Sequence, residues 1–157
     1  LNNERNKHMY PDDPLAPGLY SPSYLYAITV FANPLMWFEI SNLSDEYKRQ
    51  MKHMIKLCRP IRKEIAQSNV YPIGEEPDGF SISGFISLYV KGNGYAIVFR
   101  GAGNNDSIDV QVPLSDGQYK FELLAGKGNV SEKVNDGKIT FSIPYKYKFS
   151  LYKFEKD

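Results

Sequence analysis

Cysteine, tryptophan and histidine are scarce in this chain. Its 157 residues include one cysteine, one tryptophan and two histidines. The single Cys58 cannot form an internal disulfide, so no disulfide framework supports the fold and the cysteine content leaves the cellular compartment undefined. His8 and His53 are distant in sequence, and neither has a partner at the spacing of a zinc site. We therefore expect no metal site and no cofactor.

The sequence also lacks an excess of charge of either sign. Lys and Arg number 19 and Asp and Glu number 18, which gives a formal net charge of +1. Such a chain has no overall field that would attract nucleic acid or an anionic membrane. Its hydrophobic fraction of 42% and charged fraction of 24% are ordinary for a globular protein. We expect neither nucleic acid nor a membrane among its partners, and the composition defines no cellular location.

A long uninterrupted apolar run is absent as well. The most apolar segment, Tyr24 to Ile40, has 13 apolar residues among 17, but Asn33-Pro34 interrupts it and Glu39 stands near its end. A membrane span needs about 20 predominantly apolar residues. The segment is therefore not expected to cross a membrane.

The same segment is expected to be helical. Ser21 is placed as an N-cap and Pro22 as the first helical residue, so we expect a helix from Pro22 to Ala32. Pro34 lacks an amide donor, which predicts a kink at Asn33-Pro34 and a second short helix from Pro34 to Ile40.

Apolar residues cover all sides of these predicted helices, and such helices need burial in a large core. The rest of the chain offers little material to surround them. We therefore expect this chain to be part of a larger protein and to begin within a domain. If the partner is missing, Trp37 and Phe38 should add to an exposed apolar surface. We then expect either self-association of the chain through its helices or a mobile N-terminal segment.

A second, longer helix is predicted from Asp45 to Gln67. Ser44 is placed as its N-cap, Asp45 and Glu46 lie in its first turn, and Pro60 predicts a kink. Its apolar residues recur at intervals of three and four, which predicts an amphipathic helix lying on a surface. The apolar stripe comprises Tyr47, Met51, Met54, Cys58, Ile61 and Ile65, and the basic face Lys48, Lys52, Lys56, Arg59 and Lys63.

The residue pattern changes near Asn69 from helical to alternating. Segments rich in Ile, Val, Phe and Tyr are separated by turn sequences such as Gly92-Asn93-Gly94 and Asp136-Gly137, which predicts an antiparallel β-sandwich. The expected fold is mainly β, with a helical segment at residues 1–69 and the sandwich at residues 70–157. The predicted strands are Val70 to Ile73, Ile82 to Val90, Tyr95 to Arg100, Ser107 to Val112, Tyr119 to Leu124, Lys138 to Ile143 and Lys146 to Phe154.

Particular segments suggest a family. Residues 10–39 contain Tyr-Pro-Asp-Asp-Pro-Leu-Ala-Pro, Ser-Pro-Ser-Tyr-Leu-Tyr-Ala and Phe-Ala-Asn-Pro-Leu-Met-Trp-Phe-Glu, and residues 71–79 are Tyr-Pro-Ile-Gly-Glu-Glu-Pro-Asp-Gly. These segments fall within residues 10–79, about half of the chain, and resemble the C-terminal end of alpha-galactosidase-like (melibiase-like) glycoside hydrolases. The resemblance implies helices left over from the end of a (β/α)8 catalytic barrel, followed by an antiparallel sandwich packed against that barrel.

The resemblance also implies where the chemistry lies. In such enzymes two carboxylates about 5 Å apart act as nucleophile and general acid/base, and they stand at the C-terminal ends of middle barrel strands. Those strands would precede Leu1. We therefore expect no catalytic, substrate-binding or metal-binding residue in this chain, with the missing barrel as its partner and a carbohydrate as the substrate of the parent enzyme.

Several polar residues invite a functional interpretation, but structural roles are favoured. Asp12 and Asp13 lie in a proline-rich segment typical of a turn. Glu75, Glu76 and Asp78 lack the regular ligand spacing of a calcium loop. Cys58 belongs to an apolar stripe, where a buried thiol is usual. The basic helix face is expected to be solvated. Gly92-Asn93-Gly94 is expected to form a hairpin turn and not a phosphate-binding loop, because no helix start follows it.

Aromatic residues near the C-terminus leave a second function open. Apolar and polar residues alternate in this segment, with Tyr145, Tyr147, Phe149 and Leu151 on one face and Lys146, Lys148 and Ser150 on the other. This pattern predicts a strand with an apolar face that packs into the sandwich core and a polar face exposed to solvent. Sugar-binding modules expose an aromatic ring, most often tryptophan, and the only tryptophan here is Trp37. A tyrosine could replace it. The alternatives to a supporting domain of a hydrolase are thus a stand-alone carbohydrate-binding module and an oligomerisation module.

Overall fold

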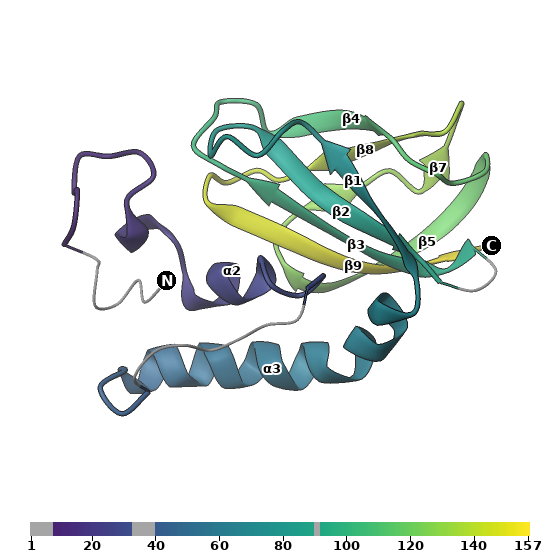
Figure 1. The fold of residues 1–157 in the computed structure, drawn as a ribbon. Coiled ribbons are helices and arrows are strands. Elements are labelled where there is room, and N and C mark those ends of the chain that lie inside the picture. Colours follow the sequence, from purple (N-terminus) through teal and green to yellow (C-terminus); the bar gives the residue numbers. More distant parts are fainter. Residues whose placement is uncertain (1–7, 33–39, 90–91) are drawn as a thin grey trace. The chain divides into compact units, whose positions relative to one another are not determined.

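A computed structural model describes residues 8–32, 40–89 and 92–157 of the chain. It divides into two compact units, residues 1–63 and 64–157, and each is described by itself. The sequence-based boundary was placed at residues 69 and 70. The architecture is mainly β, with two antiparallel sheets and one main helix (Figure 1).

The first helices of the chain are short. A single 3-10 turn, η1, spans Pro17–Leu19, and α2 spans Pro22–Ala27. The cap of α2 is confirmed, because the amide of Tyr24 donates a hydrogen bond to Oγ of Ser21 at 3.1 Å.

The predicted extension of α2 to Ala32 is wrong. Residues 28–32 form turns closed by bonds between residues three apart, such as Val30 N–H to the Ala27 carbonyl. Ile28, Thr29 and Val30 are β-branched, which lowers helix propensity, and Oγ1 of Thr29 donates to the Tyr26 carbonyl at 2.7 Å. The predicted kink at Asn33-Pro34 and most of the second helix from Pro34 to Ile40 lie outside the described residues.

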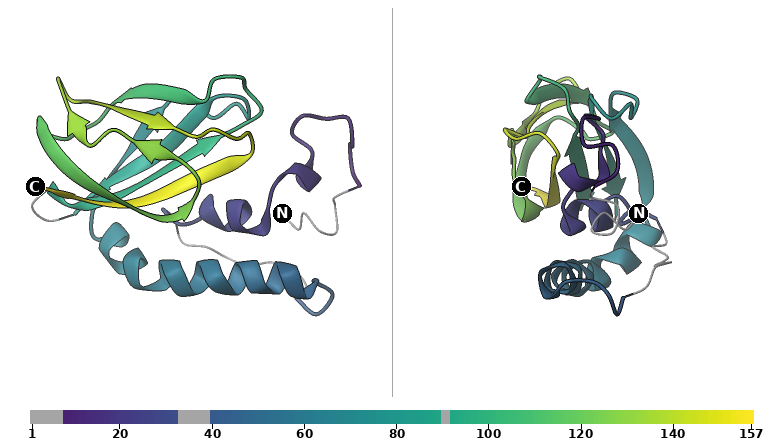
Figure 2. Two further views of the ribbon diagram at one scale, coloured as in Figure 1. Left: turned by 180° about the vertical axis from the view of Figure 1, so that it is seen from behind. Right: turned by 90° about the vertical axis from the view of Figure 1, so that its left-hand side faces the viewer.

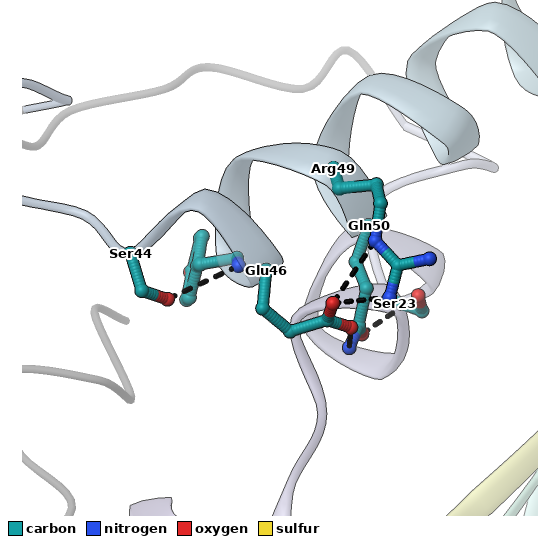
Figure 3. Close-up of polar contacts among 6 residues, drawn as sticks. Ser23, Ser44, Glu46, Arg49 and Gln50 are labelled. Atoms are coloured by element: carbon teal, nitrogen blue, oxygen red, sulfur yellow. Dashed lines mark hydrogen bonds and ion pairs between the residues drawn. The ribbon is translucent and has the colours of Figure 1, made fainter.

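The main helix, α3, spans Asp45–Ala66, in agreement with the prediction. The amide of Tyr47 donates to Oγ of Ser44 at 3.2 Å, which confirms the N-cap (Figure 3). One carboxylate in the first turn, Glu46, accepts hydrogen bonds from Nε of Arg49 at 2.9 Å and from Nε2 of Gln50 at 2.7 Å. Gln50 also accepts a bond from the hydroxyl of Ser23, which joins α3 to α2 (Figure 3).

The amphipathic pattern of α3 is confirmed. Its predicted apolar stripe is buried, with Ile61 half-buried, and its basic face is exposed, with Lys48 half-buried. Pro60 lies inside the helix. The kink expected there stays a prediction.

The described part of the second unit contains nine strands in two antiparallel sheets. The six-stranded sheet has the order β1-β2-β3-β9-β5-β7, and the three-stranded sheet has the order β4-β8-β6. Figures 1 and 2 show the larger sheet curling. The bounds are β1 Asn69–Gly74, β2 Ile82–Leu88, β3 Gly94–Arg100, β4 Ser107–Gln111, β5 Gly117–Gly126, β6 Asn129–Val130, β7 Lys133–Val134, β8 Lys138–Ser142 and β9 Lys148–Lys156.

The core of this unit joins residues of both sheets. Phe141 of β8 and Tyr152 of β9 have ring centroids 6.0 Å apart, and Phe121 of β5 lies 5.3 Å from Phe154. A sandwich buries the inner faces of its two sheets in this way. The buried cluster comprises Ile73, Ile82, Ile86, Ala96, Val98, Val110, Val112, Leu114, Tyr119, Val134, Ile139, Phe141, Ile143, Tyr152 and Phe154.

One prediction placed the core on the wrong face of β9. Tyr152 and Phe154 belong to the sandwich core, whereas Phe149 and Leu151 point to the opposite face because side chains alternate along a strand. Both faces are nevertheless buried: Leu151 and Ser150 are each 0% exposed. The face predicted to be exposed to solvent is therefore buried at Ser150.

The face of the large sheet that points away from the sandwich core is buried at β3 as well. Ile97 and Tyr95 are only 1% and 3% exposed. The hydroxyl of Tyr95 donates to the carboxylate of Glu64, in the last turns of α3, at 2.6 Å. Burial, together with this carboxylate, raises the pKa of Tyr95 above its ordinary value. The sheet thus has two apolar faces rather than one.

The remaining strand predictions hold with small changes. β9 begins at Lys148 instead of Lys146, because Lys146 and Tyr147 form a turn and Tyr147 has a φ of 56°. The two-residue strands β6 and β7 were not predicted, since two residues carry no alternation.

The cap of α3 makes a testable contribution to stability. Replacing Ser44→Ala removes the acceptor for the Tyr47 amide, and we expect the free energy of unfolding to fall by about 1 kcal/mol. Urea denaturation measures the change. Ser44→Asp keeps an acceptor at the same position and is expected to keep the stability. An equal loss in both variants would contradict a capping role.

Candidate functional site

A cleft opens at one end of the sandwich, between the β1–β2 and β3–β4 connections. Its volume is about 200 Å³. These two connections lie side by side, because the amide of Ala102 donates to the carbonyl of Gly79 at 2.8 Å and that of Gly103 to Phe80 at 2.9 Å (Figure 1). We call it the loop cleft. Its lining includes Glu75, Phe80, Asn104, Asn105, Ser107 and Ile108.

Asp78 fixes the β1–β2 side of the loop cleft. One carboxylate oxygen, Oδ1, accepts hydrogen bonds from the amides of Phe80 and Ser81, both at 2.8 Å. These amides stabilise the charged carboxylate and hold the pKa of Asp78 below its ordinary value. The hydrogen bonds to Asp78 therefore fix the backbone of Phe80 within the β1–β2 connection.

Arg100 fixes the β3–β4 side. Its side chain is only 5% exposed, and one guanidinium nitrogen donates to the Ile143 carbonyl at 2.8 Å. The other terminal nitrogen donates to the carbonyls of Gly103 and Asn104 at 3.4 and 3.1 Å. A buried guanidinium needs several acceptors. Here backbone carbonyls supply them to the two terminal nitrogens, whereas Nε has no partner among the described residues, and the loop takes its shape around the cation.

Glycine is required where the two connections meet. A Cβ atom on Gly103 would lie 2.2 Å from the carbonyl oxygen of Phe80, and one on Gly101 would lie 2.0 Å from that of Gly79. Any larger residue would force the connections apart.

The open side of the loop cleft combines an aromatic ring with polar groups. Phe80 is 45% exposed, while Ile82, which also lines the cleft, is buried. The side chains of Glu75, Asn105 and Ser107 are exposed and make no hydrogen bond within the described part of the chain. Oδ1 of Asn104 accepts a bond from Nζ of Lys146 at 3.0 Å. The lining thus offers an apolar surface beside an amide, a hydroxyl and a carboxylate.

The acidic residues considered from the sequence mostly have turn roles. Oδ1 of Asp13 accepts a bond from the Leu15 amide at 2.8 Å, and Asp12 is exposed beside it. Asp78 caps the β1–β2 turn, Glu75 lines the loop cleft and Glu76 is exposed. Among the described residues, no group of three or more His, Cys, Asp or Glu could hold a metal ion.

The other candidates lie apart from the loop cleft. His8 and His53 are exposed. The connection that contains Gly92-Asn93-Gly94 joins the antiparallel neighbours β2 and β3, which confirms a hairpin. Tyr145 is 57% exposed, and Nζ of Lys127 lies 5.4 Å from its ring centroid. Trp37 lies outside the described residues.

Of the residues that line the loop cleft, only Glu75 attracts attention in the sequence, as an acidic residue without the spacing of a calcium ligand. The sequence singles out none of the others. The signal that could have found them is the large apolar Phe80 directly after the turn sequence Pro77-Asp78-Gly79, where small or polar residues are usual.

Comparison of the chain with protein-family models, curated proteins and solved structures gave no match. No helix in the described ranges is both long enough and apolar enough to cross a membrane.

The close approach at Gly103 can be tested by stability. Gly103→Ala places a methyl group against the Phe80 carbonyl, and we expect it to lower the free energy of unfolding by about 1–3 kcal/mol. Asn105→Ala, two residues away and exposed, is expected to change it by less than about 0.5 kcal/mol. Urea denaturation compares the two variants. Equal stabilities would show that the connections are not tightly packed.

Cys58 is predicted to be chemically inert in the folded chain. The thiol is 0% exposed, and burial raises its pKa to about 11. At pH 8 a thiol reagent should modify Cys58 far more slowly in the native chain than in concentrated urea, because the reactive species is the thiolate. Reaction at equal rates would contradict this burial.

The same pKa shift also predicts a pH dependence. The unfolded thiol loses its proton near pH 9.0, before the folded thiol does, so the stability due to Cys58 should fall between pH 9.0 and about 11. Denaturation across this range, with Cys58→Ala as the control, isolates the contribution.

Proposed function

We propose that this chain is the C-terminal, non-catalytic region of an alpha-galactosidase-like glycoside hydrolase. In this proposal its helices continue the end of a (β/α)8 catalytic barrel, and its sandwich packs against the barrel and stabilises it. The parent enzyme would be a retaining glycosidase, with its two catalytic carboxylates on barrel strands upstream of this chain.

The observation that carries the proposal is the resemblance of residues 10–39 and 71–79 to that family. The second segment includes most of β1 and the turn capped by Asp78. The segment follows the junction of α3 with β1, and this position is compatible with the crossover region that the resemblance implies. The helical segment followed by an antiparallel sandwich is also compatible with that assignment.

Exposed apolar side chains are compatible with a missing partner. Such patches mark interaction surfaces when they are contiguous, and single exposed residues are common. Among the described residues, the first unit has as many large exposed apolar residues as the longer second unit. In the first unit they are Met9, Tyr10, Leu15, Leu19, Ile28, Ile40 and Ile55. A barrel wall would cover side chains of this kind.

The proposal predicts that the chain alone has no glycosidase activity. Purified chain should hydrolyse an aryl alpha-galactoside no faster than buffer, because the catalytic carboxylates would lie outside it. A chromogenic assay with a complete alpha-galactosidase as positive control measures this. Hydrolysis above background that co-purifies with the chain would contradict the assignment.

A second test concerns the coding sequence upstream of Leu1. We expect an open reading frame that continues into a barrel with two carboxylates at strand ends. An unrelated upstream sequence would refute the proposal.

The exposed apolar residues also predict the behaviour of the isolated chain. Without its partner it should self-associate, and sedimentation velocity should show species larger than a monomer at raised concentration. Ile28→Lys, at a side chain 53% exposed, should reduce association without loss of fold. Ile55→Lys, at another exposed apolar residue of the first unit, should reduce association as well. A strictly monomeric chain would argue against an uncovered partner surface.

A further inference from the structure

We propose that the loop cleft binds one pyranose ring of a carbohydrate, which stacks on Phe80 while its hydroxyl groups bond to Asn105, Ser107 and Glu75. This inference does not rest on the proposed function. It adds a binding site to a region that would otherwise have only a supporting role.

The exposed ring of Phe80 is the first step of the argument. The ring is 45% exposed, so a ligand that covered it would remove apolar surface from water, which is favourable. The ring cannot readily turn inward by moving its backbone, because its amide is held by Asp78 and its carbonyl by the Gly103 amide. A ligand with a flat apolar face can cover it.

The polar groups define the rest of the ligand. An amide can donate and accept, a hydroxyl can do both, and a carboxylate accepts. A sugar hydroxyl also donates and accepts, so it matches this mixture. The carboxylate of Glu75 disfavours a phosphate or another anion, and the described lining contains no cation, since Lys146 bonds to Asn104 from outside it. A neutral polyhydroxylated ligand fits best.

The size of the cleft limits the ligand. Sites for drug-sized ligands have volumes of about 300–1,000 Å³, whereas this one measures about 200 Å³. A single ring, alone or at the end of a chain, suits a hollow of this size better than a longer buried ligand does.

The cleft is also preorganised. Arg100 holds the carbonyls of Gly103 and Asn104, and the glycines allow the two connections to touch. Binding therefore requires little ordering of the loops, which reduces its free-energy cost.

The direct test is NMR titration of the full chain with methyl glycosides of galactose, glucose and mannose. We expect saturable shifts of the Gly103 and Asn105 amides with at least one glycoside, with a Kd on the order of 1 mM. Glycerol, which has hydroxyl groups but no ring face, should bind at least about tenfold more weakly. Absence of saturable shifts with all three glycosides, or equal binding of glycerol, would overturn the proposal.

Variants locate the site. Phe80→Ala should weaken binding at least about tenfold, and Asn105→Ala should weaken it less. Phe85→Ala, at an exposed aromatic residue of β2, should leave it unchanged. The amide spectrum of each variant verifies its fold. Unaltered binding by Phe80→Ala, or loss of binding by Tyr145→Ala in its place, would overturn the assignment to this cleft.

A nucleoside is the competing ligand, because a base can also stack on a ring. Adenosine is therefore titrated in parallel. Tighter binding of adenosine than of any glycoside would overturn the sugar assignment. Neither result affects the hydrolase proposal, which the glycosidase assay and the upstream sequence test separately.

Discussion

The arrangement of the second unit depends on one buried cation. Arg100 stands at the end of β3 in the large sheet, and its guanidinium bonds to the carbonyl of Ile143, directly after β8 of the small sheet. The same group binds the carbonyls that shape the β3–β4 connection. Because a buried charge must keep its acceptors, sheet pairing and loop shape are coupled. The end of the sandwich and the wall of the loop cleft are consequently parts of one structure.

Local signals in the sequence accounted for the elements. Ser21 and Ser44 predicted two helix starts, and the alternation of Ile, Val, Phe and Tyr predicted seven of the nine strands. Local rules failed to predict the end of α2, because two local preferences competed there. At Ile28-Thr29-Val30 apolar character suggested a helix, whereas β-branching favoured turns. Local rules were also insufficient at β9, because a strand buried on both faces has no single apolar side.

The loop cleft could not be predicted for a different reason. Its two sides are separated by more than 20 residues, and they meet only because β2 and β3 pair in an antiparallel hairpin. Phe80 and Asn105 each have an ordinary turn context, so neither is distinctive alone. What makes them a candidate site is the tertiary approach at Gly101 and Gly103, which depends on distances that no local pattern encodes.

The edges of the large sheet restrict how this chain can associate. One edge is β7, which has only two residues, and the other is β1, which contains Pro72. A proline has no amide hydrogen to offer a neighbouring strand, and very short edge strands offer few pairing groups. Growth of the sheet from molecule to molecule, the first step toward cross-β aggregation, is therefore disfavoured at both edges. At these two strands, a partner is expected to meet the large sheet through side chains.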